Sequence, residues 1–192
     1  MNTVHRLQHE ITRHREETTY PDTQRFPATR RNADTTETMT STRNAESVER
    51  TIAAPASTIF ALLANPVRHR DIDGSGTVRD ASEPSQALTL GSKFGMDMKL
   101  GLSYSMQSTV IEFEQDRLIA WQTAPSNAIM AKLAGGRIWR YELEPVEGGT
   151  LVRETWDISK EVVPAFVRPL RSRTNKAMAA TLERIEALVV AN

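Results

Sequence analysis

The 192-residue chain contains no cysteine, and this absence excludes several kinds of chemistry at once. Without thiols the protein can form no disulfide, no thiolate metal site and no cysteine nucleophile. The chain also lacks an excess of either charge, because 24 Lys and Arg residues balance 24 Asp and Glu residues. A dedicated nucleic-acid-binding protein shows a basic excess. Nucleic acid is therefore not expected as a partner.

Long apolar segments are missing as well. No run approaches the roughly 20 residues that a membrane-spanning helix requires. The charged N-terminal region contains no apolar core of a signal peptide. We therefore expect a cytoplasmic protein without stable membrane insertion, either a monomer or a homodimer. Its length fits one domain together with a tail.

Residues 1–44 differ in composition from the rest of the chain. The stretch Thr18–Asn44 is rich in Thr, Arg, Asp and Asn and has few large apolar residues. Such a segment buries too little apolar surface to offset the entropy of ordering it. We predict a disordered tail over 1–44 and a folded domain over 45–192, with Met39 as an alternative start if the upstream reading frame is misassigned. His5 and His9 have metal-ligand spacing, but a solvated helix face is the simpler interpretation.

The predicted domain begins with one strand and two short helices. The segment 47–52 alternates as a strand does. A helix after Pro55 presents Ile59, Phe60, Leu62 and Leu63 and ends at Asn65–Pro66. A second short helix over 67–72 and a turn at Asp73–Gly76 follow.

The central part of the chain predicts antiparallel strands. Residues 93–100 alternate between apolar and polar side chains. The segments 104–114 and 117–123 flank a polar turn and predict a hairpin. A second hairpin joins 137–146 to 150–158. A two-residue loop at Gly148–Gly149 would place Tyr141 opposite Trp156 and Leu143 opposite Glu154, with an apolar face and a face of opposite charges.

The chain ends in a predicted long helix from about Leu170. Met178, Leu182, Ile185 and Val189 recur every three or four residues and form one apolar stripe. An antiparallel sheet must bury one face, and this helix is the natural cover. The predicted fold class is α+β, a curved antiparallel sheet wrapped around the C-terminal helix. A ligand cavity between the two is a reasonable expectation.

Four blocks of sequence resemble the START-like (SRPBCC) superfamily in its polyketide cyclase/dehydrase branch. They are Ile52–Pro66 (IAAPASTIFALLANP), His69–Val78 (HRDIDGSGTV), Arg140–Thr150 (RYELEPVEGGT) and Met178–Ile185 (MAATLERI). The resemblance begins near Ser47 and does not include the tail. It implies a helix-grip fold with a deep apolar cavity. Relatives bind lipids, sterols, hormones or polyketides, and only some are enzymes.

The residues expected to contact a ligand are mainly aromatic and methionine side chains, because Met adapts to irregular apolar shapes. They are Phe94, Met96, Met98, Tyr104, Met106, Trp121, Met130, Trp139, Tyr141, Glu154, Trp156, Met178 and Leu182. The longer connection between Trp121 and Arg137 is either a flap over the cavity, with Gly135–Gly136 as a flexible joint, or an ordinary surface excursion.

Few residues suggest catalysis. Glu154 is an acid on an apolar face, which raises its pKa or requires a partner, and Glu112 is a weaker candidate. His69 is better explained as structural than as a member of a triad, and one His with two loop Asp residues is a poor metal site. No cofactor or metal is expected. The basic residues Arg168, Arg171, Arg173 and Lys176 form either a solvated face or a site for an anionic group.

Two functions remain open. The first is binding of a hydrophobic small molecule, such as a lipid, fatty acyl chain or polyketide, in the internal cavity. The second is an aromatase/cyclase-type enzyme in which Glu154, Tyr141 or Tyr104 transfers protons. They differ in whether two titratable groups converge inside the cavity.

Overall fold

The computed structural model describes residues 37–81 and 86–190. Its central element is one eight-stranded antiparallel sheet in the order β1-β2-β8-β7-β6-β5-β4-β3. The strands are β1 (Glu37–Ser41), β2 (Ala45–Ile52), β3 (Val78–Ala81), β4 (Lys93–Leu100), β5 (Leu102–Glu114), β6 (Leu118–Pro125), β7 (Arg137–Val146) and β8 (Gly149–Asp157).

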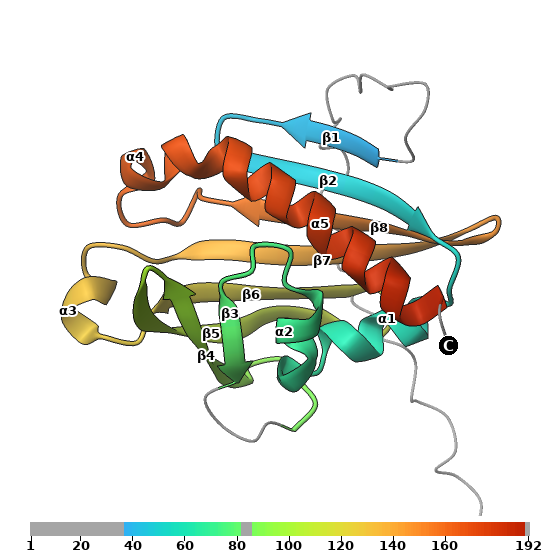
Figure 1. Cartoon of the computed structure of the whole chain (residues 1–192), viewed down its shortest axis with the longest axis horizontal. Helices are drawn as coiled ribbons and strands as arrows, with labels where there is room; N and C mark the ends of the chain where they lie inside the picture. The colour runs from blue at the N-terminus through green and yellow to red at the C-terminus, as the bar shows by residue number, and fades with distance from the viewer. Residues whose placement is uncertain (1–36, 82–85, 191–192) are drawn as a thin grey trace, which may run out of the picture.

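The long C-terminal helix α5 runs across one face of this sheet (Figure 1). The helices are α1 (Ala56–Leu63), the 3₁₀ turn η1 (Pro66–Arg68), α2 (His69–Ile72), α3 (Ala128–Ala131), α4 (Pro164–Val167), the 3₁₀ turn η2 (Arg168–Leu170) and α5 (Arg171–Val190). The predicted α+β helix-grip fold is confirmed, and so is the start of the last helix near Leu170. Within the described residues, no helix combines the length and the apolar character needed to cross a membrane.

A packed core fills the space between α5, α1 and the adjoining strands. The predicted α5 stripe provides Met178, Leu182 and Ile185, all buried. Phe60 of α1 meets Phe113 of β5 edge to face, with ring centroids 5.4 Å apart. Burial of these side chains holds α5 against the sheet, since each contributes about 1.5–3 kcal/mol when fully removed from water.

The β7–β8 hairpin has the predicted faces but a different register. Val146 pairs with Gly149, so the turn lies at residues 147–148 and every pairing is shifted by two residues from the predicted one. Tyr141 lies opposite Glu154, and Trp139 lies opposite Trp156. A shift of two residues keeps each side chain on its own face, because strand side chains alternate with a period of two. The predicted partners were therefore wrong although the predicted faces were right.

Residues 37–44 correct the predicted boundary of the tail. β1 pairs along β2, and Ser41 Oγ donates a 2.9 Å hydrogen bond to the buried carboxylate of Glu46. Asn175 Nδ2 of α5 donates to the same carboxylate at 3.1 Å, and Arg171 Nε lies 3.3 Å from it. These contacts order a polar segment that composition alone assigns to disorder. The alternative start Met39 lies within β1.

Residues 1–36 lie outside the described residues. The predicted disorder of this segment, and the proposed spacing of His5 and His9, therefore remain sequence-based expectations.

Candidate functional site: a cavity beneath the C-terminal helix

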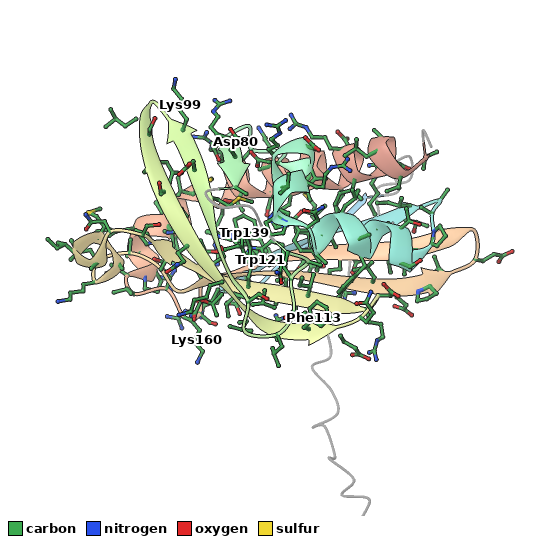
Figure 2. The ribbon with its side chains drawn as sticks, turned by 90° about the horizontal axis from the view of Figure 1, so that it is seen from below. Asp80, Lys99, Phe113, Trp121, Trp139 and Lys160 are labelled. Atoms are coloured by element: carbon green, nitrogen blue, oxygen red, sulfur yellow. The ribbon has the colours of Figure 1, made fainter. Side chains whose placement is uncertain are left out.

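A cavity of about 860 Å³ lies between α5 and the inner face of the sheet. Eleven of the thirteen residues predicted to contact a ligand line it, and ligand contact itself stays a prediction. They are Phe94, Met96, Met98, Tyr104, Met106, Trp121, Met130, Trp139, Tyr141, Glu154 and Met178. Figure 2 shows Trp121 and Trp139 side by side in the interior, as expected for the directly paired residues of β6 and β7.

Two predicted contact residues do not line the cavity. Trp156 and Leu182 are fully buried members of the packed core. Both face inward, as predicted, but other side chains cover them. A periodic pattern identifies the inner face of an element without revealing which part of that face is packed and which part is open. Trp156 and Leu182 are therefore not part of the cavity wall, and contact of either with a ligand stays an untested prediction.

Glu154 and Tyr141 form a buried polar pair in the cavity wall. Tyr141 Oη donates a 2.8 Å hydrogen bond to Glu154 Oε1, and Glu154 Oε2 is buried without a protein partner. Burial raises the pKa of Glu154 to about 8, because water no longer stabilises the charged form. The hydrogen bond from Tyr141 lowers this pKa in part, and the charge of Asp73 raises it. Near neutral pH, Glu154 is therefore mainly a protonated acid that can donate as well as accept.

His69 occupies an aromatic wall of the same cavity. Its ring stacks on Trp121 at 5.1 Å between centroids and meets Phe94 edge to face at 5.4 Å. Its Nε2 lies 2.8 Å from the Leu63 carbonyl oxygen, which can only accept, so Nε2 carries the proton. Burial lowers the pKa of His69 to about 4. His69 therefore holds α2 against the end of α1, in agreement with the structural interpretation.

The turn after α2 closes the cavity on its α5 side. The Asp73 carboxylate accepts hydrogen bonds from the backbone nitrogens of Ser75 (2.9 Å), Thr77 (2.8 Å) and Val78 (2.8 Å). Gly74 lies directly against α5, where a Cβ would come within 2.1 Å of the Ala177 carbonyl oxygen. Asp73 thus organises the turn, and Gly74 allows it to touch the helix.

The mouth of the cavity lies where the β4–β5 hairpin, α3 and the start of α5 meet. Tyr104, Met130, Leu170 and Arg173 line the cavity here and are also exposed to solvent. Among the described residues, Arg173 has no ion-pair or hydrogen-bond partner. An arginine at the entrance can contact an anionic group of a bound molecule.

The connection that carries α3 borders the mouth, but its predicted glycine joint is anchored. Gly136 donates from its backbone nitrogen to the Thr123 carbonyl oxygen (2.9 Å) and accepts from Gln122 Nε2 (3.1 Å). Gly135 accepts from the backbone of Val162 (2.9 Å) and donates to the buried Glu161 carboxylate. Both glycines have positive φ, which explains their residue type without requiring motion. The predicted flexible joint is therefore corrected to a fixed corner.

The sequence analysis did not predict several polar residues that line the cavity. They are Ser105, Ser108, Thr123, Ser126, Asn127 and Arg137. The alternation of β5 could have indicated Ser108, which lies on the same face as Tyr104 and Met106. Ser108 Oγ and Thr123 Oγ1 are 3.1 Å apart, so these hydroxyl groups satisfy each other inside the wall.

Glu112, the second predicted acid, is not in the cavity. A bulge in β5 leaves Val110 opposite Trp121 but puts Glu112 opposite Ala120, on the other face of the sheet. There Arg140 Nε donates to Glu112 Oε2 at 3.0 Å. An extra residue in a bulge reverses the alternation on which the prediction depended.

In the predicted basic group, Arg171 forms an ion pair with Glu46 and donates a 3.0 Å hydrogen bond to the Thr42 carbonyl oxygen, whereas Arg173 lies at the mouth.

In the part of the chain that the structure describes, no three His, Asp or Glu side chains are grouped to hold a metal ion.

Comparison with known proteins decides the family. The model of the family described as "Polyketide cyclase / dehydrase and lipid transport" matches residues 45–190. The chain belongs to this family. The match begins at the first residue of β2 and covers the whole cavity.

Two curated proteins of Mycobacterium tuberculosis strains match part of the chain. An uncharacterized protein of Mycobacterium tuberculosis is 41% identical over 117 residues, which make up 60% of this chain and 47% of the relative. The chain thus spans about half the length of the curated relatives it matches.

Solved structures share the fold at low sequence identity. A solution structure from Arthrobacter aurescens has a TM-score of 0.65 and 15% identity, covering 82% of this chain and 94% of that one. A crystal structure from Mycobacterium smegmatis has a TM-score of 0.61 and 14% identity, covering 86% and 98%. These likenesses establish the fold alone.

Proposed function

We propose that the protein binds one hydrophobic small molecule, such as a lipid, a fatty acyl chain or a polyketide-like compound, between the sheet and α5. The observation that carries this proposal is the cavity of about 860 Å³ with its wall of aromatic and methionine side chains. Its volume is within the range of small-molecule sites, about 300–1,000 Å³. The name of the family, with its reference to lipid transport, agrees with a ligand of this class.

The polar pair in the wall adds a requirement on the ligand. The free oxygen of Glu154 is buried beside Tyr141 and has no protein partner. A buried polar atom without a partner costs about 1–3 kcal/mol. A ligand that places a carbonyl or hydroxyl oxygen beside Glu154 removes this cost, because the protonated acid can donate to it. The proposed ligand is thus apolar along most of its length and carries at least one oxygen.

The test is a titration of ligand-free protein with a fluorescent fatty acid, together with native mass spectrometry of protein purified from its own host. Thr174 lines the cavity from α5, and Lys176 is exposed on the same helix without lining it. We expect Thr174→Trp to fill the cavity and weaken binding at least about tenfold, whereas the matched control Lys176→Trp binds as wild type does. Equal affinities of the two variants would contradict binding in the cavity.

A second function, an aromatase/cyclase-type enzyme, is favoured by one observation. Tyr141 and Glu154 are two titratable groups in direct contact inside the cavity. In an enzyme, Glu154 would transfer a proton to or from a poly-keto chain. Glu154→Gln retains a donor and the side-chain volume, so a purely binding protein should keep its affinity within about threefold. An enzyme should lose about 10²–10⁴-fold in turnover with little change in affinity, as measured by product formation and calorimetry.

A further inference from the structure

A band of exposed apolar side chains surrounds the mouth of the cavity. We call these residues the rim: Leu102, Tyr104, Ile129, Met130, Leu133, Val162, Phe166 and Leu170. Leu102 is 84% exposed, Ile129 73% and Phe166 71%, which is unusual for large apolar side chains. Single exposed apolar residues are common on proteins, but a contiguous group marks an interaction surface.

Three separate segments bring the rim together. They are the tip of the β4–β5 hairpin, the connection carrying α3, and the segment that includes α4 and η2. The backbone nitrogen of Ser126 donates to the Ser105 carbonyl oxygen at 3.0 Å, and that of Val162 donates to the Gly135 carbonyl oxygen at 2.9 Å. These bonds link the three segments, and Figures 1 and 2 show all three at the same end of the molecule. Each segment contributes one residue that also lines the cavity, namely Tyr104, Met130 and Leu170.

The exposed charges in the rim segments have one sign. Residues 99–106, 126–133 and 159–173 contain a single acid, Glu161. Glu161 is buried, and its Oε2 accepts from Arg137 Nε at 3.0 Å. The exposed charged residues of these segments are Lys99, Lys132, Lys160, Arg168 and Arg173. These three segments therefore carry a net positive charge, whereas the whole chain carries none.

We propose that the rim docks on the surface of an anionic lipid bilayer. An apolar surface surrounded by basic side chains binds at such an interface by burying the apolar groups among the headgroups and acyl chains, while the cations contact anionic lipids. The cavity opens at the centre of this surface, so an apolar molecule could pass between bilayer and cavity without crossing water.

The charge pattern favours a bilayer over a second copy of the chain. A symmetric dimer through the rim would place the five basic residues of one copy against the same five of the other. Like charges that face each other disfavour such an interface. An anionic bilayer supplies the opposite charge, and its interior accepts the apolar side chains.

The experiment is co-sedimentation of the full chain with vesicles of phosphatidylcholine alone or with about one third phosphatidylglycerol. We expect binding to the anionic vesicles that decreases in 0.5 M salt, because the electrostatic screening length is then only about 4 Å. The double variant Leu102→Ser/Phe166→Ser should weaken binding at least about tenfold. Lys132→Glu should weaken it about fivefold or more. Neither variant alters a residue that lines the cavity.

Matched controls lie at the other end of β4. Leu90 is 65% exposed and Lys93 is exposed, and neither belongs to the rim segments. Leu90→Ser and Lys93→Glu should bind vesicles as wild type does. The proposal is overturned if wild type shows no preference for anionic vesicles, or if the rim variants bind no more weakly than these controls. A wild-type dimer that the double variant converts to monomer in sedimentation velocity would assign the rim to a second copy instead.

The vesicle assay needs no added ligand, so it is independent of the cavity test. Docking without a cavity ligand would leave the rim proposal intact and contradict the proposed function. The opposite result, ligand binding without docking, would contradict the rim proposal alone.

Discussion

At the scale of single residues, burial in the cavity wall shifts the pKa values of Glu154 and His69 in opposite directions. Burial favours the neutral form of both Glu154 and His69. For the acid this raises the pKa, and for the base it lowers the pKa. The groups that act on Glu154 are Tyr141 of β7 and Asp73 of the turn after α2. His69 is acted on by the Leu63 carbonyl and Asp73.

These shifts predict how stability depends on pH. Between pH 4.5 and 8, folded Glu154 holds a proton that the unfolded chain releases, so its contribution to stability is lost as pH rises through this range. Between pH 4 and 6.5, unfolded His69 binds a proton that the folded form does not, so its contribution rises with pH. The two effects oppose each other below pH 6.5, and above it only that of Glu154 remains.

We therefore expect wild type to lose about 1–2 kcal/mol more stability than Glu154→Gln between pH 6.5 and 8. The measurement is urea unfolding at both pH values. Glu142→Gln, which changes a carboxylate on the outer face of β7, is the control and should follow wild type. Parallel pH profiles for wild type and Glu154→Gln would mean that Glu154 is ionised in the folded protein.

At the scale of elements, the short turn after α2 determines how closely α5 approaches. The backbone nitrogen of Gly74 donates to Thr181 Oγ1 at 3.0 Å, so turn and helix are in direct contact. The atoms nearest to Gly74 belong to the backbone of α5, which cannot rotate away as a side chain can. The residue type at position 74 is therefore required by the packing of two elements that are far apart in sequence.

We expect Gly74→Ala to destabilise the protein by about 3 kcal/mol or more, because the added methyl group must displace α5. Gly76→Ala is a matched control in the same turn. It has positive φ but open space around it, and should cost only about 1 kcal/mol of backbone strain. Thermal and urea unfolding measure both. Equal losses would show that the turn can move away from α5 without penalty.

At the scale of the whole molecule, the concave face of the sheet is divided into a packed half and an open half. Trp139 and Trp156 lie on opposite sides of this division, although they are direct partners across β7 and β8. Trp156 is enclosed by the core, whereas Trp139 lines the cavity and is only half-buried. Removing a packed side chain creates a new void, whereas removing a wall residue enlarges an existing space.

We expect Trp156→Ala to cost about 3–5 kcal/mol and Trp139→Ala about 1–2 kcal/mol in urea unfolding. Only Trp139→Ala should also change the affinity for a fluorescent fatty acid beyond what its effect on stability explains. If the two substitutions reduced the free energy of unfolding by similar amounts, Trp139 would be as closely packed in solution as Trp156, which would contradict an open cavity beside it.

The sequence by itself determined most of the elements and most of their inner faces. Leu182 and Ile185 on α5 and the aromatic face of the β7–β8 hairpin follow from the periodicity of helices and strands, which depends on neighbours along the chain. The inward position of Glu154 was predicted in the same way, and the two-residue error in register did not change it.

Only the tertiary structure decided which inner residues are packed and which line the cavity. In that structure Tyr141 lies opposite Glu154, and a bulge puts Glu112 on the outer face of the sheet. Hydrogen bonds to the Glu46 carboxylate hold residues 37–44 in place. Each of these depends on contacts between segments far apart in the chain, at distances and registers that no local pattern contains. The periodicity of a sequence predicts the face of a helix or strand on which a side chain lies. A cavity forms where side chains from several elements leave space between them, and this depends on how those elements pack together.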